Sequence, residues 1–378
     1  MRDVLPQLRQ WSGRFALATV ISTFRSAPRP PGAVMAVSAD GVAVGSVSGG
    51  CVEADVYAVA QDVIRTGVPV VRRYGVSDDD VFAVGLTCGG VIEVLVEPID
   101  PSSCTFAAVA AAVELGRPLA VATVVGPEVA PGRLVIEPGR VSGSLGDPGL
   151  DAAVADDALG MLDSGSSAVR EYGVHGECRR TEIAVFVRVF TRPPRMVVFG
   201  AIDFAAALAR VGKFLGYHVT VCDARAVFAT RARFPDADEV VVDWPHRYLA
   251  GVTDQVDRRT ALCVLTHDPK FDVPLLQVAL RTSAGYIGAM GSRRTHEDRL
   301  ARLRAAGVSE EELARLTSPT GLDLGARTPE ETAISIAAEI IAQRTAASGR
   351  PLSTTTGRIH GALDVPGLSR LLSASALP

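Results

Sequence analysis

Lysine, histidine and aromatic residues are scarce in this 378-residue chain, which carries a formal net charge of -4. Only Lys213 and Lys270 are lysines, so arginine supplies nearly all of the positive charge. A net negative chain lacks the basic surface that nucleic acids and anionic membranes require, so we expect neither as its main partner. No apolar run has membrane-spanning length, and Asp3 and Pro6 interrupt the start where a signal peptide would be apolar. We therefore expect a cytoplasmic protein.

Cysteine is present but not clustered, because the six cysteines lie at positions 51, 88, 104, 178, 222 and 263. Such scatter forms no disulfide framework, and a cytoplasm would keep the thiols reduced. The first 174 residues contain no histidine, and Cys51 and Cys88 lack the short Cys-x-x-Cys spacing. A structural zinc site in this region is therefore disfavoured.

Two motifs in the first hundred residues place a thiol directly beside two glycines, Gly49-Gly50-Cys51 and Cys88-Gly89-Gly90. Adjacent glycines let the backbone adopt positive φ and turn its amides toward an anion. A thiol in that setting predicts sulfur chemistry or anion binding. The alternative is that both cysteines are small buried apolar residues, as unpaired cysteines often are.

The two motifs lie in different predicted elements. Apolar residues recur at helical spacing after Cys51 as far as Gly67, a suitable C-terminal cap, so Cys51 should lie at or near a helix N-terminus. The helix dipole there favours a thiolate, although Glu53 in the first turn opposes it. The second motif leads into a predicted strand over residues 91–96, which Pro98 should end.

The rest of the N-terminal region reads mainly as strands. We predict a strand over residues 15–22, a hairpin over residues 33–47 and a helix over residues 151–162. Between the strand and the hairpin, a proline-rich loop carries Arg25 and Arg29. These two arginines could clamp a phosphate or simply be solvated.

A proline pair within residues 192–195 predicts a linker, after which strands alternate with helices. That alternation is typical of a doubly wound parallel sheet. The expected strands cover residues 196–200, 218–223, 239–243, 261–266 and 286–288. Helices should cover residues 204–215, begin near Asp272 and Ser292, and begin again at Thr328, where a capping box and an early proline coincide. The sequence thus predicts an α/β protein with a mixed α+β domain over residues 1–192, a Rossmann-like domain over residues 196–345 and a flexible tail over residues 346–378.

Ligands of such sheets bind beyond the carboxyl ends of the strands, so the residues that follow each strand are candidate ligand-binding residues. Asp223 has the spacing from Gly200 expected of a ribose-binding acid, and the cluster that ends in two arginines resembles a phosphate cradle. His267 is either a site residue or a structural imidazole. The candidates are Gly200, Asp223, Arg225, Thr266, His267, Asp268, Gly288, Gly291, Ser292, Arg293 and Arg294.

The first turn of this domain departs from the dinucleotide fingerprint Gly-x-Gly-x-x-Gly. It reads Gly200-Ala201-Ile202-Asp203, which places a branched side chain and a negative charge where a pyrophosphate must approach. NAD(P) binding is therefore disfavoured against a purely structural Rossmann shell or a different ligand.

Taken together, the motifs resemble those of the XdhC/CoxI family, the accessory factors of xanthine dehydrogenase and aerobic carbon monoxide dehydrogenase. The resemblance extends over roughly residues 13 to 343. The matching N-terminal motifs are Ser26-Ala27-Pro28-Arg29, Gly32-Ala33-Val34-Met35, Gly49-Gly50-Cys51-Val52-Glu53 and Cys88-Gly89-Gly90. The matching C-terminal motifs are Asp223-Ala224-Arg225, Phe234-Pro235-Asp236-Ala237, Thr266-His267-Asp268, the run from Tyr286 to Arg294, Gly321-Leu322-Asp323-Leu324-Gly325 and Thr328-Pro329-Glu330-Glu331. The family's first Rossmann turn usually reads Gly-Ala-Gly-His, and Ile202 and Asp203 replace its last two residues here.

This resemblance implies a protein that binds the molybdenum cofactor (molybdopterin), assists its sulfuration and inserts it into a molybdenum hydroxylase, without being the dehydrogenase itself. Cys51 would be the principal sulfur ligand of the molybdenum, with Cys88 close to it. The pterin phosphate would be held by glycine amides and arginines, namely Gly49, Gly50, Gly89, Gly90, Arg25 and Arg29, together with the candidates of the Rossmann-like domain. The implied partners are a molybdenum hydroxylase apoenzyme, a cysteine desulfurase and a second copy of the chain. Two alternatives stay open: an NAD(P)-dependent oxidoreductase, and a regulatory module that senses nucleotide or pterin.

Overall fold

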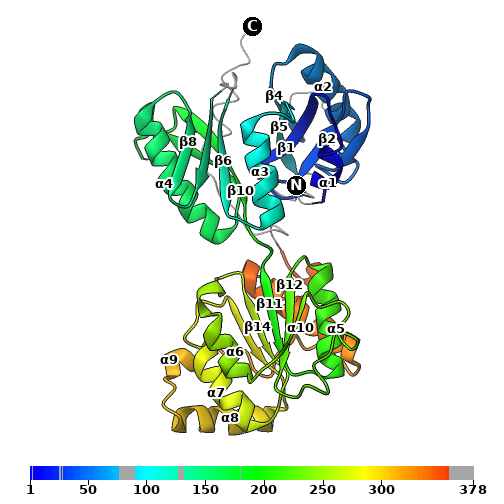
Figure 1. The fold of residues 1–378 in the computed structure, drawn as a ribbon, viewed down its shortest axis with the longest axis vertical. Coiled ribbons are helices and arrows are strands. Elements are labelled where there is room, and N and C mark those ends of the chain that lie inside the picture. Colours follow the sequence, from blue (N-terminus) through cyan, green and yellow to red (C-terminus); the bar gives the residue numbers. More distant parts are fainter. Residues whose placement is uncertain are drawn as a thin grey trace. The chain divides into compact units, whose positions relative to one another are not determined.

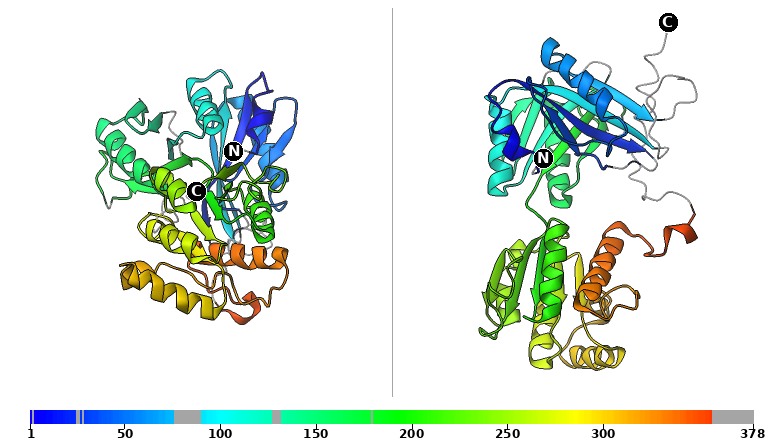
Figure 2. Two further views of the ribbon diagram at one scale, coloured as in Figure 1. Left: turned by 60° about the horizontal axis from the view of Figure 1, so that its bottom comes forward. Right: turned by 90° about the vertical axis from the view of Figure 1, so that its right-hand side faces the viewer.

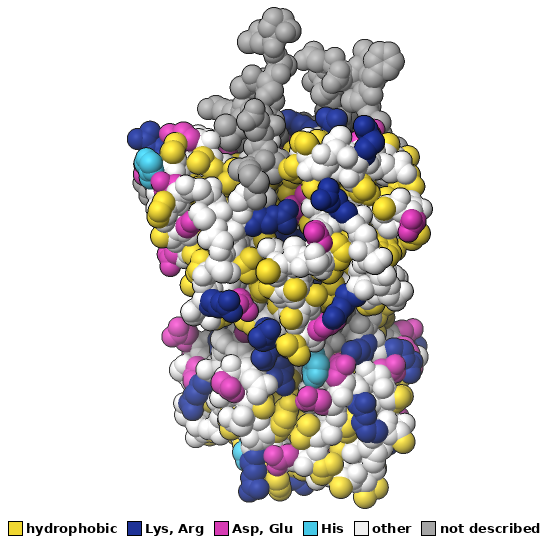
Figure 3. Space-filling model, turned by 45° about the horizontal axis from the view of Figure 1, so that its top comes forward, with side chains coloured by type: hydrophobic (Ala, Val, Ile, Leu, Met, Phe, Trp, Pro, Cys, Tyr) yellow, Lys and Arg dark blue, Asp and Glu magenta, His cyan; other side chains and the backbone are white. Residues whose placement is uncertain are grey.

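The protein is represented by a computed structural model, which describes residues 1, 3–24, 27, 29–75, 90–126, 132–178 and 180–356. These residues divide into two compact units, Met1–Arg192 and Pro193–Thr356 (Figure 1). No helix within the described ranges combines the length and the apolar character needed to cross a bilayer. On the face drawn in Figure 3, acidic and basic side chains are interspersed, as suits a chain of net charge -4.

The first half of the first unit is an antiparallel sheet with one helix packed on it. A short helix, α1 (Leu5–Leu8), precedes the sheet, whose strand order is β3-β2-β1-β5-β4. The strands are β1 (Phe15–Phe24), β2 (Val34–Val37), β3 (Ala43–Gly45), β4 (Val70–Gly75) and β5 (Val91–Ile99), and α2 (Glu53–Thr66) connects β3 to β4.

The second half of this unit repeats that topology. Helix α3 (Cys104–Leu115) joins the two halves, and the second sheet has the order β8-β7-β6-β10-β9. Its elements are β6 (Leu119–Val125), β7 (Arg133–Glu137), β8 (Arg140–Ser144), α4 (Pro148–Ser164), β9 (Ala168–Tyr172) and β10 (Ile183–Phe190). In the part of the chain that the structure describes, each half therefore runs through three strands, a helix and two strands, and the order of the strands in the sheet is the same in both halves.

Side chains along each strand point alternately to the two faces of the sheet, and both faces of each sheet contain buried apolar residues. On one face of each sheet, side chains pack under the helix of that half, α2 or α4. Side chains of the opposite faces meet in a shared cluster that includes Ile21, Leu95, Val125 and Phe186. The first unit is thus two sheets packed face to face, with a helix on each outer side.

The second unit is a parallel sheet covered by helices on both faces (Figure 2). The order β13-β12-β11-β14-β15 reverses between β11 and β14, the switch point where doubly wound sheets bind ligands. The strands are β11 (Arg195–Phe199), β12 (His218–Asp223), β13 (Glu239–Val242), β14 (Ala261–Val264) and β15 (Tyr286–Ala289). Helices α5 (Asp203–Phe214) and α10 (Pro329–Thr345) pack together on one face. Helices α6 (Pro245–Gly251), α7 (Pro269–Ala279) and α8 (Arg293–Ala305) cover the other, and α9 (Glu310–Leu313) follows α8.

The predicted α/β fold is confirmed, but several element boundaries differ. Strand β5 continues through Pro98 to Ile99, because β4 pairs with β5 only as far as Val96 and Pro98 therefore has a single neighbouring strand. Helix α7 begins at Pro269, earlier than predicted, because Asp268 caps it by accepting a hydrogen bond from the amide of Lys270.

The start of the long C-terminal helix is defined by a local signal. Thr328 and Glu331 form the predicted capping box at the start of α10. Beyond its end, residues up to Thr356 are described and include the short turn Leu352–Thr354, whereas the rest of the predicted tail lies outside the described residues.

Candidate functional site

Cys51 lies in the loop between β3 and α2, two residues before the helix begins at Glu53. Its side chain is half-buried and packs against the apolar cluster under α2. The preceding glycines have φ values of +85° at Gly49 and +122° at Gly50, which side-chain-bearing residues rarely adopt. Two glycines are therefore needed to shape the loop that presents this thiol.

The amides of this loop converge on a carboxylate of the protein itself. Glu53 Oε1 accepts hydrogen bonds from the amides of Ser48 at 2.9 Å and Gly49 at 3.0 Å, and Oε2 accepts one from the amide of Gly50 at 2.8 Å. The hydroxyls of Ser46 and Ser48 donate to the same carboxylate at 2.6 and 2.5 Å. Longer contacts at 3.3 and 3.2 Å come from the amides of Val47 and Val52.

Electrostatics agree with this geometry. Burial by itself would raise the pKa of Glu53, but the hydrogen bonds from Ser46, Ser48 and the backbone together hold it well below its usual range. Glu53 is thus an ionised internal anion around which the loop folds. The sequence favoured an external anion at Gly49 and Gly50, whereas in the structure the amides of both glycines already have this acceptor.

The other candidate residues of the first unit, and the remaining cysteines of the chain, lie in varied settings. Arg25, Cys88 and Gly89 lie outside the described residues, Gly90 is buried just before β5, and Arg29 is exposed. Cys104 and Cys178 are exposed. Cys222 and Cys263 are buried in the second unit, and burial raises the pKa of each of these two thiols to about 12.

The second half of the first unit has the same loop without a cysteine. Here the amide of Leu145 donates to Asp151 at 2.7 Å, as Val47 donates to Glu53 six residues further along. His175, in the connection between β9 and β10, contacts Asp147 in this loop, with 2.8 Å between Nδ1 and Oδ2. The loop before the helix and the connection between the last two strands therefore lie side by side in this half.

In the second unit, several predicted residues meet at the carboxyl ends of the strands. Gly200, with φ of +111°, approaches so closely that a Cβ there would lie 3.0 Å from the Thr266 side chain. The Asp223 carboxylate is buried and accepts hydrogen bonds from the amide of Ala201 at 2.7 Å and from Arg225 Nη2 at 2.7 Å. Burial would raise the pKa of Asp223, but these bonds outweigh it and hold the pKa below its usual value.

These contacts occupy the acid that was expected to bind a ribose. Arg225 Nε also donates to Asp223 Oδ1 at 2.9 Å, so both carboxylate oxygens are bonded within the protein. At the start of α5, Asp203 pairs with Arg233 at 3.2 Å. The buried Asp223 is therefore already bonded within the protein, and Asp203 adds an exposed ion pair at the start of α5.

A series of buried hydrogen bonds connects the residues that follow β14 to those that follow β15. Thr266 donates to Asp272 at 2.5 Å, and Asp272 pairs with Arg299 at 3.0 Å. Arg299 also donates to the carbonyl of Met290 at 2.8 Å, which fixes the turn before α8. The sequence did not single out Asp272 and Arg299 as partners. Asp272 is an acid in the mainly apolar helix α7 and offered a signal, whereas Arg299 lies in α8, which is rich in charged residues.

The other predicted residues of this edge have more local roles. Gly288 is buried in β15, where a Cβ would collide with Tyr286 and Thr320, and Ser292 caps α8 by accepting from the amide of Thr295. Gly291 has φ of +152°, and His267 is exposed next to the helix cap Asp268. Arg293 and Arg294 are exposed at the start of α8. Within the described ranges, no three His, Cys, Asp or Glu side chains gather as metal ligands.

The chain thus has a half-buried thiol on a glycine loop in one unit and a Rossmann-like second unit whose Asp223 carboxylate is hydrogen-bonded within the protein, which defines a two-unit α/β protein. Two family profiles match the chain: the XdhC and CoxI family over residues 8–75 and 112–173, and the XdhC Rossmann domain over residues 196–340. The chain belongs to the XdhC/CoxI family.

Relatives of known name agree with this assignment. The chain is 28% identical to a probable xanthine dehydrogenase subunit of Bacillus subtilis, over 87% of this chain and 92% of that protein. It is also 28% identical to the molybdenum cofactor insertion chaperone PaoD of Escherichia coli, over 88% of this chain and 85% of that protein. A crystal structure of a xanthine dehydrogenase from Bacillus halodurans matches with a TM-score of 0.71 and 25% identity, covering 94% of this chain and 97% of that one.

Proposed function

We propose that this protein binds the molybdenum cofactor as cargo, assists its sulfuration and inserts it into a molybdenum hydroxylase. The similarity to the insertion chaperone PaoD across most of both chains supports this function. A cysteine desulfurase would supply the sulfur, the hydroxylase apoenzyme would receive the cofactor, and the chaperone would act as a homo-oligomer in the cytoplasm.

The observation that carries the proposal is the setting of Cys51. Cys51 is half-buried in the loop that precedes the N-terminus of α2, and the Glu53 carboxylate holds this loop through hydrogen bonds from its amides. A thiolate is a soft ligand, which suits molybdenum and sulfur handling. The loop amides point at Glu53, so this loop fits a sulfur ligand but does not offer an amide cradle for the cofactor's phosphate. We therefore propose that an arginine of the same unit binds the phosphate, with the exposed Arg29 as the candidate. The exposed pair Arg293 and Arg294 is a separate candidate anion site within the second unit.

We also propose that Cys88 acts beside Cys51. This proposal rests on the sequence, which places each of the two thiols next to a pair of glycines; Cys88 itself lies outside the described residues.

The test compares Cys51→Ser with Cys104→Ser, an exposed thiol on α3 that serves as a matched control. Each variant is loaded with molybdenum cofactor, passed through gel filtration, and assayed for molybdenum and pterin content and for activation of a hydroxylase apoenzyme. We expect Cys51→Ser to keep its thermal midpoint but to retain at least tenfold less cofactor, while Cys104→Ser behaves like the wild type. Full retention and activation by a protein lacking both Cys51 and Cys88 would remove the thiols from the mechanism.

A further inference from the structure

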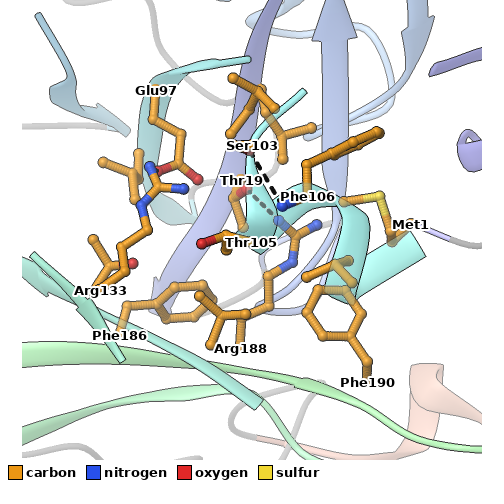
Figure 4. A pocket seen from close by; sticks show the side chains of 16 residues that line it. Met1, Thr19, Glu97, Ser103, Thr105, Phe106, Arg133, Phe186, Arg188 and Phe190 are labelled. Carbon is orange, nitrogen blue, oxygen red and sulfur yellow. Dashed lines mark hydrogen bonds and ion pairs between the residues drawn. The ribbon is translucent and has the colours of Figure 1, made fainter. Parts of the chain in front are cut away.

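A hollow of about 540 Å³, counting its open mouth, lies between the two sheets of the first unit (Figure 4). Strands of both sheets and helix α3 line it, so it belongs to neither half alone. Its apolar wall includes Leu17, Leu95, Phe106, Phe186 and Phe190. Ligand-binding pockets commonly combine such apolar walls with a few polar groups.

Arg188 of β10 extends into this hollow from the apolar face of its strand (Figure 4). The residue is only 8% exposed, and its guanidinium lies over the ring of Phe190 at 5.2 Å. Nη1 donates to Thr19 Oγ1 at 3.3 Å, whereas the buried Nη2 has no hydrogen-bond partner among the described residues. A buried donor without an acceptor costs free energy unless something else fills its place.

The other charges that line the hollow do not neutralise Arg188. Arg133 forms an ion pair with Glu97, so these two charges cancel each other. Burial lowers the pKa of Arg188 to about 10, with Glu97 opposing and Arg133 adding to that shift, and the guanidinium therefore stays protonated at neutral pH. Among the described residues, the guanidinium of Arg188 therefore has no carboxylate of its own in the hollow.

We infer that this hollow is a binding site for a small organic anion with a flat apolar body and one oxyanion group. The oxyanion accepts from Nη2 of Arg188, while the phenylalanines and leucines enclose the ring. Thr123 and Ser103 add hydroxyls to the lining. This site goes beyond the proposed function, since it lies on the opposite face of the first sheet from Cys51, which packs under α2.

The probes are three molecules that separate charge from shape: 2-naphthoate, its uncharged analogue 2-naphthamide, and inorganic phosphate. Binding to the full-length protein is followed by calorimetry and by the shift of the thermal midpoint. The variant Arg188→Met keeps the length of the side chain without its charge. Arg140→Met, on an exposed position of β8 in the same sheet, is the matched control.

We expect the wild type to bind 2-naphthoate at least tenfold more tightly than either 2-naphthamide or phosphate. Arg188→Met should lose this preference, and its midpoint without ligand should be equal to or above that of the wild type, because an uncompensated buried charge is removed. Arg140→Met should match the wild type in both respects. If Arg188→Met does not fold, the preference of the wild type for carboxylate over amide still decides the question. Equal binding of the acid and the amide, no binding of either, or tight naphthoate binding by Arg188→Met would overturn the inference.

Discussion

The strongest structural prediction concerns Glu53, whose carboxylate organises the loop that presents Cys51. The change Glu53→Gln keeps the shape of the side chain but removes its charge and turns one acceptor oxygen into a donor. Seven contacts converge on a carboxylate that has about four lone-pair positions, so we count about four full hydrogen bonds. Gln can keep about half of them.

The expected loss follows from that count. Two lost bonds from amides or hydroxyls to a charged acceptor, at about 1.5–3 kcal/mol each, destabilise the first unit by about 3–6 kcal/mol. For a unit of this size that lowers the thermal midpoint by about 6–24 °C. Scanning calorimetry of the full chain measures the shift. Asp151→Asn in the second half is the matched control, because Asp151 accepts only from Leu145 within this loop, and we expect it to cost about 1 kcal/mol.

The pH dependence supplies a second readout of the same prediction. The pKa of Glu53 is lowered in the folded state, so its contribution is present above the unfolded value of 4.5 and is lost as the pH falls toward the folded value. The difference between wild type and Glu53→Gln should therefore be constant from pH 7 to 5.5 and shrink below about pH 4.5. A midpoint within 2 °C of the wild type, or a gap that does not narrow in acid, would refute the assignment of Glu53 as the organiser of the loop.

Two further predictions concern the second unit. NAD(H) should bind weakly or not at all, because Asp223 is bonded to Ala201 and Arg225; calorimetry tests this, and a dissociation constant in the low micromolar range, about -8 kcal/mol, would contradict it. Asp272→Ala should destabilise the unit by about 3–5 kcal/mol in urea unfolding, because it leaves Arg299 buried without its carboxylate. Its control, Glu310→Ala, breaks the exposed Arg304–Glu310 pair and should cause no resolvable change, so an equal effect of both variants would show that burial is not the cause.

Local sequence signals predicted the fold well where a short pattern corresponds to a single kind of element. The capping box at Thr328 and the alternation of strands with helices after residue 195 gave the Rossmann-like unit its elements. The duplication in the first unit was missed, because the halves share a pattern of strands and helices but not the Gly-Gly-Cys motif. Topology of this kind depends on long-range pairing that short motifs do not encode.

The candidate sites were predicted less completely, for a physical reason that Glu53 and Asp223 both show. Sequence reasoning identified each as an acid near a helix start or a strand end, but it could not tell which donors would fold back onto the carboxylate. Arg188 offered a usable signal, since it is the one charge in the otherwise apolar run Ile183–Phe190. A charged residue on the inward face of a strand indicates either a buried partner or a ligand.

The two halves of the first unit also bear on how the chain assembles. Every strand pairing among the described residues of this unit stays within one half, β1 to β5 or β6 to β10, and these strands are not exchanged between the halves. During synthesis the first sheet can complete all of its pairings before the second leaves the ribosome, and the docking of the sheets is then a late event. Because β10 is the last strand of the unit, Arg188 loses its water only at that step. An anion bound to Arg188 would therefore stabilise the docked arrangement of the two sheets as well as occupy the finished protein.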